Sequence, residues 1–324
     1  MTDDIIPIRR HELGRAGLEG LPRLILDAGE HAARKFIEFF TATIRNKNTR
    51  TAYARAVGGF FDWCAQRGIG LHQISPFVVA SFIEQHPGSK PTVKQNLAAI
   101  RMLFDWLVTQ QVIPVNPATS VRGPKHVVNR GKTPVLTADQ ARQLLDSIDT
   151  ATVVGLRDRA IIAVMVYSFA RVGAVVGMAV EDYYQDGKRW WFRLHEKGGK
   201  QHNVPAHHNA EAYLDAYIEA AGIADDKHTP LFRSAHGKTG TLTDQAVTRN
   251  DVLRMIKRRA KRAELPPTTC CHTFRATGIT TYLENGGTIE NAQAIAAHAS
   301  PRTTKLYDRT GDEITLDEVE RIVI

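Results

Sequence analysis

Two short stretches near the C-terminus, CCHTFR (residues 270–275) and AAHASPRTTKLYDR (residues 296–309), decide which fold this sequence predicts. On a helix, His272 and Arg275 are three residues apart and therefore share one face. That face presents a proton donor or acceptor beside a permanent, planar cation that suits phosphate oxygens. A lone His-x-x-Arg is unspecific, so its meaning depends on the residues around it.

Other polar residues give this motif its context. Arg171 ends an apolar helical stretch, RDRAIIAVMVYSFAR (157–171), and Lys197 lies in a glycine turn, EKGGK (196–200). A second histidine, His298, precedes a tyrosine by nine residues. The chain therefore carries, in this order, Arg171, Lys197, His272, Arg275, His298 and Tyr307.

This ordered set resembles the tyrosine recombinases, the family of phage integrases and Xer-type recombinases, whose order is Arg, Lys, His-x-x-Arg, His or Trp, then Tyr. The resemblance spans nearly the whole chain. It implies a mainly α-helical fold with a small β-hairpin or sheet in the catalytic domain, arranged as a two-domain DNA clamp. The implied parts are an N-terminal extension (1–30), a helical SAM-like core-binding domain (31–115), a basic linker (116–133), a catalytic domain (134–310) and a C-terminal tail (311–324).

The resemblance also implies a reaction. Tyr307 attacks a DNA phosphate and forms a covalent 3′-phosphotyrosine link, which preserves bond energy, so neither metal nor ATP nor another cofactor is expected. A tyrosine with an ordinary pKa near ~10 is a poor nucleophile unless its proton is drawn off and nearby negative charge is stabilised. Arg171 and Arg275 would supply that stabilisation by clamping the non-bridging oxygens.

The remaining residues of the set would handle protons and contacts. By resemblance, His272 assists as acid or base, and His298 hydrogen-bonds the phosphate. Lys197 would protonate the departing 5′ oxygen, which a lysine can do when its site lowers its pKa. The same turn offers a second lysine, Lys200, as the alternative general acid.

The sequence departs from the family pattern at two places. The family commonly has an acidic residue three positions after its first arginine, where this chain has Ala174. This leaves open how the surroundings of Arg171 are organised. The Leu-Gly that usually precedes the second histidine is replaced by Ala296 and Ala297. Neither change removes a main catalytic side chain, so we expect an active enzyme.

Apolar spacing predicts a bundle of four helices in the first domain. Ser75 followed by Pro76 has the form of a helix N-cap with proline at the first helical position. Apolar residues recur at intervals of three to four along two segments, as on the buried face of an amphipathic helix. These two stripes are Tyr53, Val57, Phe60, Phe61 and Cys64, and Val93, Leu97, Ile100, Phe104 and Leu107.

The catalytic domain is predicted to open at Thr137, where Thr-Ala-Asp-Gln has the form of a capping box. WWFRLH, a glycine turn and HNVP predict two strands over residues 190–205. Further helices are expected over 208–221 and 248–263. The rest of the domain is expected to be helical.

The charge favours an acidic partner such as nucleic acid. The formal net charge is +8, and residues 1–130 hold 17 basic and 10 acidic side chains. A basic stripe on the predicted helix 248–263 suits a phosphate backbone. The candidate DNA contacts are Arg45, Lys47, Arg50, Lys90, Lys94, Arg101, Arg254, Arg258 and Arg262.

Several function classes are excluded. With 324 residues and 43% hydrophobic residues, the chain needs no disulfides to fold, so its three cysteines are expected to be reduced. No stretch approaches the roughly 20 apolar residues of a membrane span, and the first residues lack a secretory signal. The GKT at 237–239 lacks the upstream glycine of a phosphate-binding loop, and the absence of HExxH and CxxC argues against a metal site. We expect a cytoplasmic, nucleoid-associated protein.

Two other functions stay open at this level. One is a DNA-binding protein that does not cut, which Ala174 makes conceivable, and the other is a type IB topoisomerase or resolvase with the same phosphotyrosine chemistry. The resemblance implies double-stranded DNA at specific recombination sites as the partner and a tetrameric synapse as the assembly. It also leaves room for accessory DNA-bending factors. The acidic and then apolar tail is a candidate contact between protomers.

Overall fold

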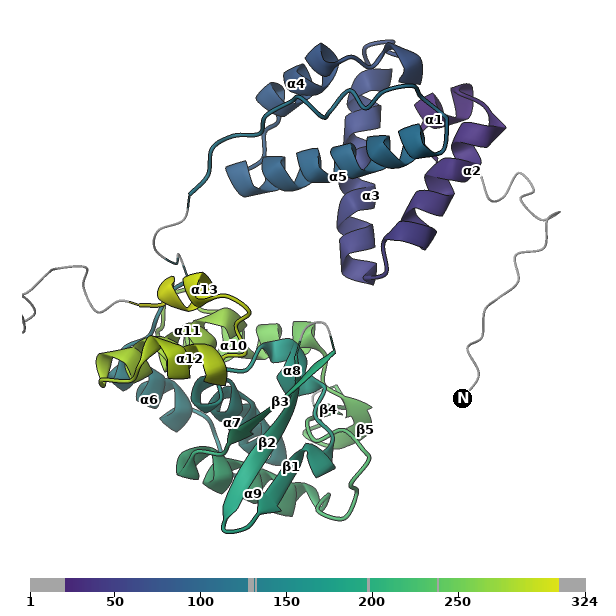
Figure 1. Ribbon diagram of the computed structural model, residues 1–324. Coiled ribbons are helices and arrows are strands. Elements are labelled where there is room, and N and C mark those ends of the chain that lie inside the picture. Colours follow the sequence, from purple (N-terminus) through teal and green to yellow (C-terminus); the bar gives the residue numbers. More distant parts are fainter. Residues whose placement is uncertain (1–20, 128–130, 132, 197–198, 238, 309–324) are drawn as a thin grey trace, which may run out of the picture. The chain divides into compact units, whose positions relative to one another are not determined.

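The chain divides into two compact units, residues 1–127 and 128–324, and each is described by itself (Figure 1). The first unit is helical. The second is helical with two small antiparallel sheets. The computed structural model describes residues 21–127, 131, 133–196, 199–237 and 239–308.

The helices of the first unit surround one apolar core. Ser75 caps a helix as predicted, because its hydroxyl accepts a hydrogen bond from the backbone N–H of Val78. Both predicted stripes face the core, although Tyr53 is only half-buried. Phe60 lies at the centre, with its ring 5.0 Å from that of Phe82. The helices are α1 (Arg23–Asp27), α2 (Glu30–Glu38), a π-helical turn (Phe39–Thr43), α3 (Lys47–Ala65), a 3-10 turn (Leu71–Gln73), α4 (Pro76–Gln85) and α5 (Lys90–Thr109).

The first unit extends beyond both predicted boundaries. At its start, α1 buries Leu24 and Ile25 in the core, so residues 23–27 are part of the bundle rather than of an extension. At its end, Ala118 and Val121 are buried, and the guanidinium of Arg101 donates to both of their carbonyls. The first residues of the predicted linker therefore pack on α5, because their apolar side chains and carbonyls find partners there.

The second unit is organised around a helix, α7, whose middle turns are buried on every side. Ile161, Val164 and Met165 are fully buried, as the uninterrupted apolar run predicted. A Cβ at Gly278 would collide with the carbonyl oxygen of Val166, so glycine lets the helix that carries His272 approach α7 closely. The helices are α6 (Ala138–Asp146), α7 (Val153–Tyr167), α8 (Val172–Val176), a 3-10 turn (Val180–Asp182), α9 (His208–Ala221), α10 (Arg249–Arg262), α11 (Cys271–Glu284), α12 (Ile289–Ile295) and α13 (Pro301–Lys305).

The two strands predicted over 190–205 are confirmed as β2 (Arg189–Glu196) and β3 (Lys200–Pro205), whereas Lys197 and Gly198 of the predicted turn lie outside the described residues. They pair antiparallel, and their last register pair, Glu196 opposite Lys200, flanks the turn. The capping box at Thr137 and the helices predicted over 208–221 and 248–263 are confirmed as well.

The prediction that the rest of the domain is helical is wrong at three strands. β1 (Tyr183–Asp186) adds to β2 and gives the order β1-β2-β3, and β4 (Arg233–Ala235) pairs with β5 (Leu242–Ala246). These strands have three to five residues, too few for a period to show in the sequence. Tertiary contacts define them, such as the ring of Tyr183 stacked 4.4 Å from that of Trp190.

Candidate active site

A fully buried guanidinium lies at the centre of the candidate site. Arg275, on α11, is 0% exposed, and it ties two loops to its helix. Its Nη2 donates to the carbonyl of Ala296 at 2.6 Å, and its Nη1 donates to the carbonyl of Phe169. Its Nε has no hydrogen-bond partner in the described structure. A buried donor without a partner is costly, and this nitrogen is free to donate a hydrogen bond to a ligand.

The second arginine of the set comes from a different element. Arg171 is the N-cap residue of α8, and its side chain remains 35% exposed. Its Nη1 donates to Oε2 of Glu196, the last residue of β2, whose side chain is only 4% exposed. One guanidinium nitrogen is thus held by a buried carboxylate, and the side chain still reaches solvent.

The second histidine and the tyrosine are packed together. Both residues are nearly buried, and their rings stack with centroids 5.7 Å apart and planes 10° apart. Nδ1 of His298 lies 2.9 Å from the hydroxyl of Thr304 on α13. The backbone carbonyl of Tyr307 accepts from the Thr280 hydroxyl at 2.9 Å, which anchors the segment after α13 on α11. The phenol of Tyr307 also lies close enough to Arg275 to interact with its guanidinium.

The charges of the two arginines act on every titratable group nearby. Burial, followed by the charge of Arg171, lowers the pKa of Arg275 to about 10, and Glu196 opposes this change. Burial and then Arg275 and Arg171 lower the pKa of His298 to about 4. Desolvation and the same two arginines lower the pKa of His272, which occupies the first turn of α11. Both histidines are therefore neutral at pH 7.

The structure brings five of the six predicted residues into one cluster, because Arg171, His272, Arg275, His298 and Tyr307 interact with one another. The sixth, Lys197, lies outside the described residues.

The alternative lysine of the turn is described. Lys200 is exposed, begins β3 and lines a shallow depression that His298 and Gln293 also line. It therefore lies near the cluster.

Residues 134–313 match the model of the phage integrase family, and residues 35–111 match that of the phage integrase N-terminal SAM-like domain. The chain belongs to the phage integrase family. As a member it is an enzyme of the tyrosine recombinase class, and the predicted family and fold are confirmed.

Curated tyrosine recombinases are similar to this integrase-family chain over most of their length. The tyrosine recombinase XerC of Thermodesulfovibrio yellowstonii is 27% identical over 271 residues, which cover 81% of this chain and 85% of XerC. The tyrosine recombinase XerD of Listeria monocytogenes serotype 4b is 27% identical over 231 residues, 70% of this chain and 74% of XerD.

Solved structures of recombinases share the fold. The XerH site-specific recombinase bound to a palindromic difH substrate, in a post-cleavage complex, matches with a TM-score of 0.70 at 17% identity, covering 94% of this chain and 98% of XerH. A lambda integrase dimer bound to a COC' core site matches with a TM-score of 0.65 at 19% identity, covering 87% of this chain and 78% of the integrase chain.

The two departures from the family pattern are both at the cluster of this recombinase. Ala174 is buried in α8, and the carboxylate beside Arg171 comes instead from Glu196. Ala297, at the position of the usual glycine, has a left-handed backbone with φ of 48°. An L-residue in this conformation is strained, and the strain lies in the turn whose carbonyl, that of Ala296, holds Arg275.

Glu196 is the functional residue that the sequence reasoning missed. A period-2 pattern could have found it, because Phe192, Leu194 and Glu196 alternate along β2 and all three are buried. A carboxylate on the inner face of a strand needs a cationic partner. Glu196 also directly precedes Lys197 in the sequence, which indicates that it lies near the predicted catalytic residues.

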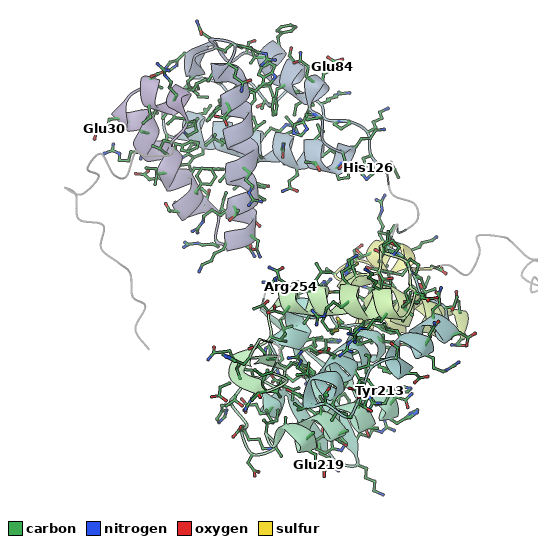
Figure 2. The ribbon with its side chains drawn as sticks, turned by 180° about the vertical axis from the view of Figure 1, so that it is seen from behind. Glu30, Glu84, His126, Tyr213, Glu219 and Arg254 are labelled. Atoms are coloured by element: carbon green, nitrogen blue, oxygen red, sulfur yellow. The ribbon has the colours of Figure 1, made fainter. Side chains whose placement is uncertain are left out.

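The basic helix α10 of this recombinase has a buried side and a charged side. Val252, Met255 and Ile256 are buried, whereas Arg254, Arg258 and Arg262 are exposed, as the proposed DNA-contact stripe requires. Figure 2 shows Arg254 on this helix, at the surface of the second unit, and Arg254 also pairs with Asp251 within the same helix.

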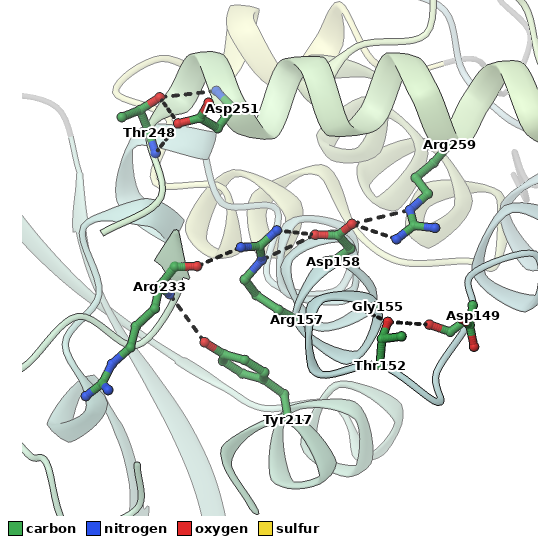
Figure 3. Close-up of polar contacts among 10 residues, drawn as sticks. All are labelled: Asp149, Thr152, Gly155, Arg157, Asp158, Tyr217, Arg233, Thr248, Asp251 and Arg259. Carbon is green, nitrogen blue, oxygen red and sulfur yellow. Dashed lines mark hydrogen bonds and ion pairs between the residues drawn. The ribbon is translucent and has the colours of Figure 1, made fainter. Parts of the chain in front are cut away.

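One basic residue of α10 instead holds the helix in place. Arg259 pairs with the fully buried Asp158 of α7 at 2.8 Å, and Asp158 also pairs with Arg157 at 2.8 Å (Figure 3). Arg157 donates further to the carbonyl of Arg233 on β4 at 2.7 Å. This network fixes α10 and the second sheet on α7, so the exposed arginines project from a rigid support.

The candidate DNA contacts of the first unit fall into two groups. Arg50 donates to the carbonyl of Ile44, and Arg101 donates to the carbonyls described above, so both guanidiniums are partly used by the fold. The four others are exposed: Arg45, Lys47, Lys90 and Lys94.

No described helix is long and apolar enough to cross a membrane, and no three described His, Cys, Asp or Glu side chains are grouped so that they could hold a metal ion.

Proposed function

We propose that this recombinase cleaves and rejoins DNA strands at specific sites through a covalent 3′-phosphotyrosine link at Tyr307, without metal or ATP. The observation that carries the proposal is the position of this tyrosine, stacked on a neutral histidine and in contact with the buried Arg275. The guanidinium thus lies where negative charge develops while the phenolic oxygen attacks phosphorus.

In this proposal the two arginines stabilise charge on the phosphate. Arg275 offers an unpartnered buried Nε, and Arg171 has donors beyond the one that Glu196 uses. Donors fixed before the reaction stabilise the phosphoryl-transfer transition state without reorganisation, in a site largely closed to water. The arginines thus supply the charge that metal ions supply in other phosphoryl-transfer enzymes.

The two histidines are proposed to bind the phosphate and to transfer the proton of the tyrosine. His298 is neutral, and its Nδ1 faces Thr304, which leaves Nε2 to hydrogen-bond a phosphate oxygen. His272, on the accessible first turn of α11, accepts the proton of Tyr307 and returns it when the strand is rejoined. Lys197, or Lys200 beyond the same turn, protonates the departing 5′ oxygen.

We propose the domains and partners that the resemblance implies, with the first unit beginning at α1. Exposed basic side chains of both units bind double-stranded DNA, supported by solved relatives of this fold that are bound to recombination-site DNA. The residues after 127 link the units, the tail from 311 contacts a neighbouring protomer, and a tetramer synapses two sites. The enzyme acts at the nucleoid in the cytoplasm, with room for accessory DNA-bending factors.

The test is covalent trapping on nicked suicide duplexes that carry the sequences flanking the gene, without metal or ATP. We expect a protein–DNA adduct on a denaturing gel with the natural chain and none with Tyr307→Phe, which keeps the ring but lacks the nucleophile. Binding to the same DNA without an adduct would contradict the proposal and favour the DNA-binding protein that does not cut. Relaxation of supercoils on DNA of any sequence would favour the topoisomerase alternative.

A further inference from the structure

One buried carboxylate of the cluster has no role in the chemistry described so far. Glu196 ends β2 on its inner face, and its Oε2 accepts a hydrogen bond from Nη1 of Arg171. At 4% exposure the side chain is removed from water, so its charge is stabilised by its partner and not by solvent.

The position that carries the carboxylate in the family pattern holds none here. Ala174 is buried in α8, three residues after Arg171, and its methyl group packs in the apolar core. The only contribution of α8 itself to Arg171 is therefore through the backbone.

From these two observations we propose that Glu196 is a positioning residue of this recombinase, which holds Arg171 in the orientation that binds the scissile phosphate. It replaces, from the neighbouring sheet, the carboxylate that Ala174 does not provide. The inference rests on the proposed function, since it assigns the purpose of the Arg171 position within that reaction.

The charges in the cluster explain why such a residue is needed. Arg171 and Arg275 repel each other: burial is the main cause that lowers the pKa of Arg275, the charge of Arg171 lowers it further, and Glu196 counters this change. An arginine that is one-third exposed and repelled by its neighbour would otherwise turn toward water in the absence of substrate. The carboxylate keeps it beside Arg275 before the phosphate arrives.

The origin of Glu196 in the sheet has a second consequence. Its register partner across the turn is Lys200, and the next residue along the chain is Lys197. A carboxylate on α8 would hold Arg171 within one element, whereas Glu196 joins α8 to the hairpin that carries both candidate general-acid lysines. The ion pair therefore ties Arg171 to the end of β2, where the hairpin continues toward these lysines.

The experiment compares single-turnover cleavage of the suicide substrate at saturating DNA. For Glu196→Ala we expect a loss of about 10- to 100-fold in rate, the scale of a misplaced catalytic group, with DNA affinity unchanged. Glu196→Gln, which keeps the shape and loses the charge, should fall between this variant and the natural chain.

A second substrate separates positioning from a folding defect. A methylphosphonate at the scissile position lacks one charged non-bridging oxygen, so an arginine that stabilises that charge matters less. If Glu196 acts through Arg171, the deficit of Glu196→Ala shrinks on this substrate, whereas a loss of folded protein lowers cleavage of both substrates equally.

A matched control is Asp182→Ala, which removes another buried carboxylate beside the same sheet. Asp182 lies 3.5 Å from Nη1 of Arg193, a residue outside the cluster. It should keep the cleavage rate. The inference is overturned if Glu196→Ala cleaves at the natural rate, or if both substrates show the same deficit. Failure of the proposed function is a different result, since the natural chain itself would then form no adduct.

Discussion

The second unit contains two clusters in which two arginines surround one buried carboxylate, and they are built for opposite purposes. In the closed cluster, Arg157 and Arg259 each bind one oxygen of Asp158, and little of any side chain reaches solvent. In the open cluster, Glu196 binds a single nitrogen of Arg171, and Arg275 retains an unpartnered Nε. Both clusters contain two arginines and one carboxylate. In the closed cluster both carboxylate oxygens are paired, and the cluster stabilises the fold. In the open cluster the arginines keep unpaired donors, which are available to a ligand.

The largest effect is expected from emptying the closed cluster. Asp158→Ala leaves two nearly buried guanidiniums without their carboxylate, which should lower the free energy of unfolding by about 3–5 kcal/mol. Denaturant unfolding measures this loss, and cleavage per folded molecule should be retained. Glu196→Ala is the control, with a smaller loss of stability because water can solvate Arg171. Equal losses for the two variants would erase the distinction between the clusters.

The next effect concerns the rate of the reaction. Arg171→Ala removes a preorganised donor of the open cluster and should slow adduct formation by about 10²–10³-fold. Because Arg171→Ala also leaves the buried carboxylate of Glu196 without its partner, it should lower the free energy of unfolding as well, by about 1–3 kcal/mol. Single-turnover cleavage and denaturant unfolding of the same preparation test both halves. Cleavage that persists at the natural rate would remove Arg171 from the mechanism.

A smaller effect is the pH dependence of stability. The described residues of the open cluster include two histidines, whereas the closed cluster consists of two arginines and an aspartate. The folded-state pKa of His298, about 4, lies below the ordinary value of 6.5, so the unfolded chain takes up the proton first as the pH falls. Its contribution to stability is complete above about pH 6.5 and is lost as the pH falls toward 4. Between pH 7 and pH 5 the loss is about 2 kcal/mol.

Denaturant unfolding of the natural chain and of His298→Gln at the two pH values isolates this contribution. The variant should lose about 2 kcal/mol less than the natural chain between pH 7 and pH 5, because glutamine does not titrate. Identical pH dependence in both proteins would show that the burial of His298 does not govern its titration.

The smallest effect concerns strain in the open cluster. Ala297→Gly relieves a left-handed backbone and should raise the free energy of unfolding by about 0.5–1 kcal/mol, with part of the gain offset by the greater freedom of glycine in the unfolded chain. Gly286→Ala is the reverse control, since its φ of 83° should make alanine destabilising. A loss of stability in Ala297→Gly would show that the turn is not strained.

Local patterns in the sequence were sufficient for the helices and for the chemistry. The stripe from Val93 to Leu107, the capping box at Thr137 and the bounds of α9 follow from spacings of three to four residues, which act within one helix. The catalytic set was predicted from the resemblance of six residues in a fixed order to the tyrosine recombinases, and the roles of these residues stay predictions.

Contacts between distant residues decided the rest. Arg171 and Glu196 are 25 residues apart in the sequence, and Arg259 and Asp158 are 101 residues apart. No local pattern therefore distinguishes Arg259, which faces inward, from the other arginines of α10. The short strands and the burial of α1 likewise depend on partners elsewhere in the chain. The sequence by itself determined which side chains are available to the reaction. Only the tertiary structure decided which carboxylate holds which arginine, because burial and charge pairing depend on where the chain brings them together.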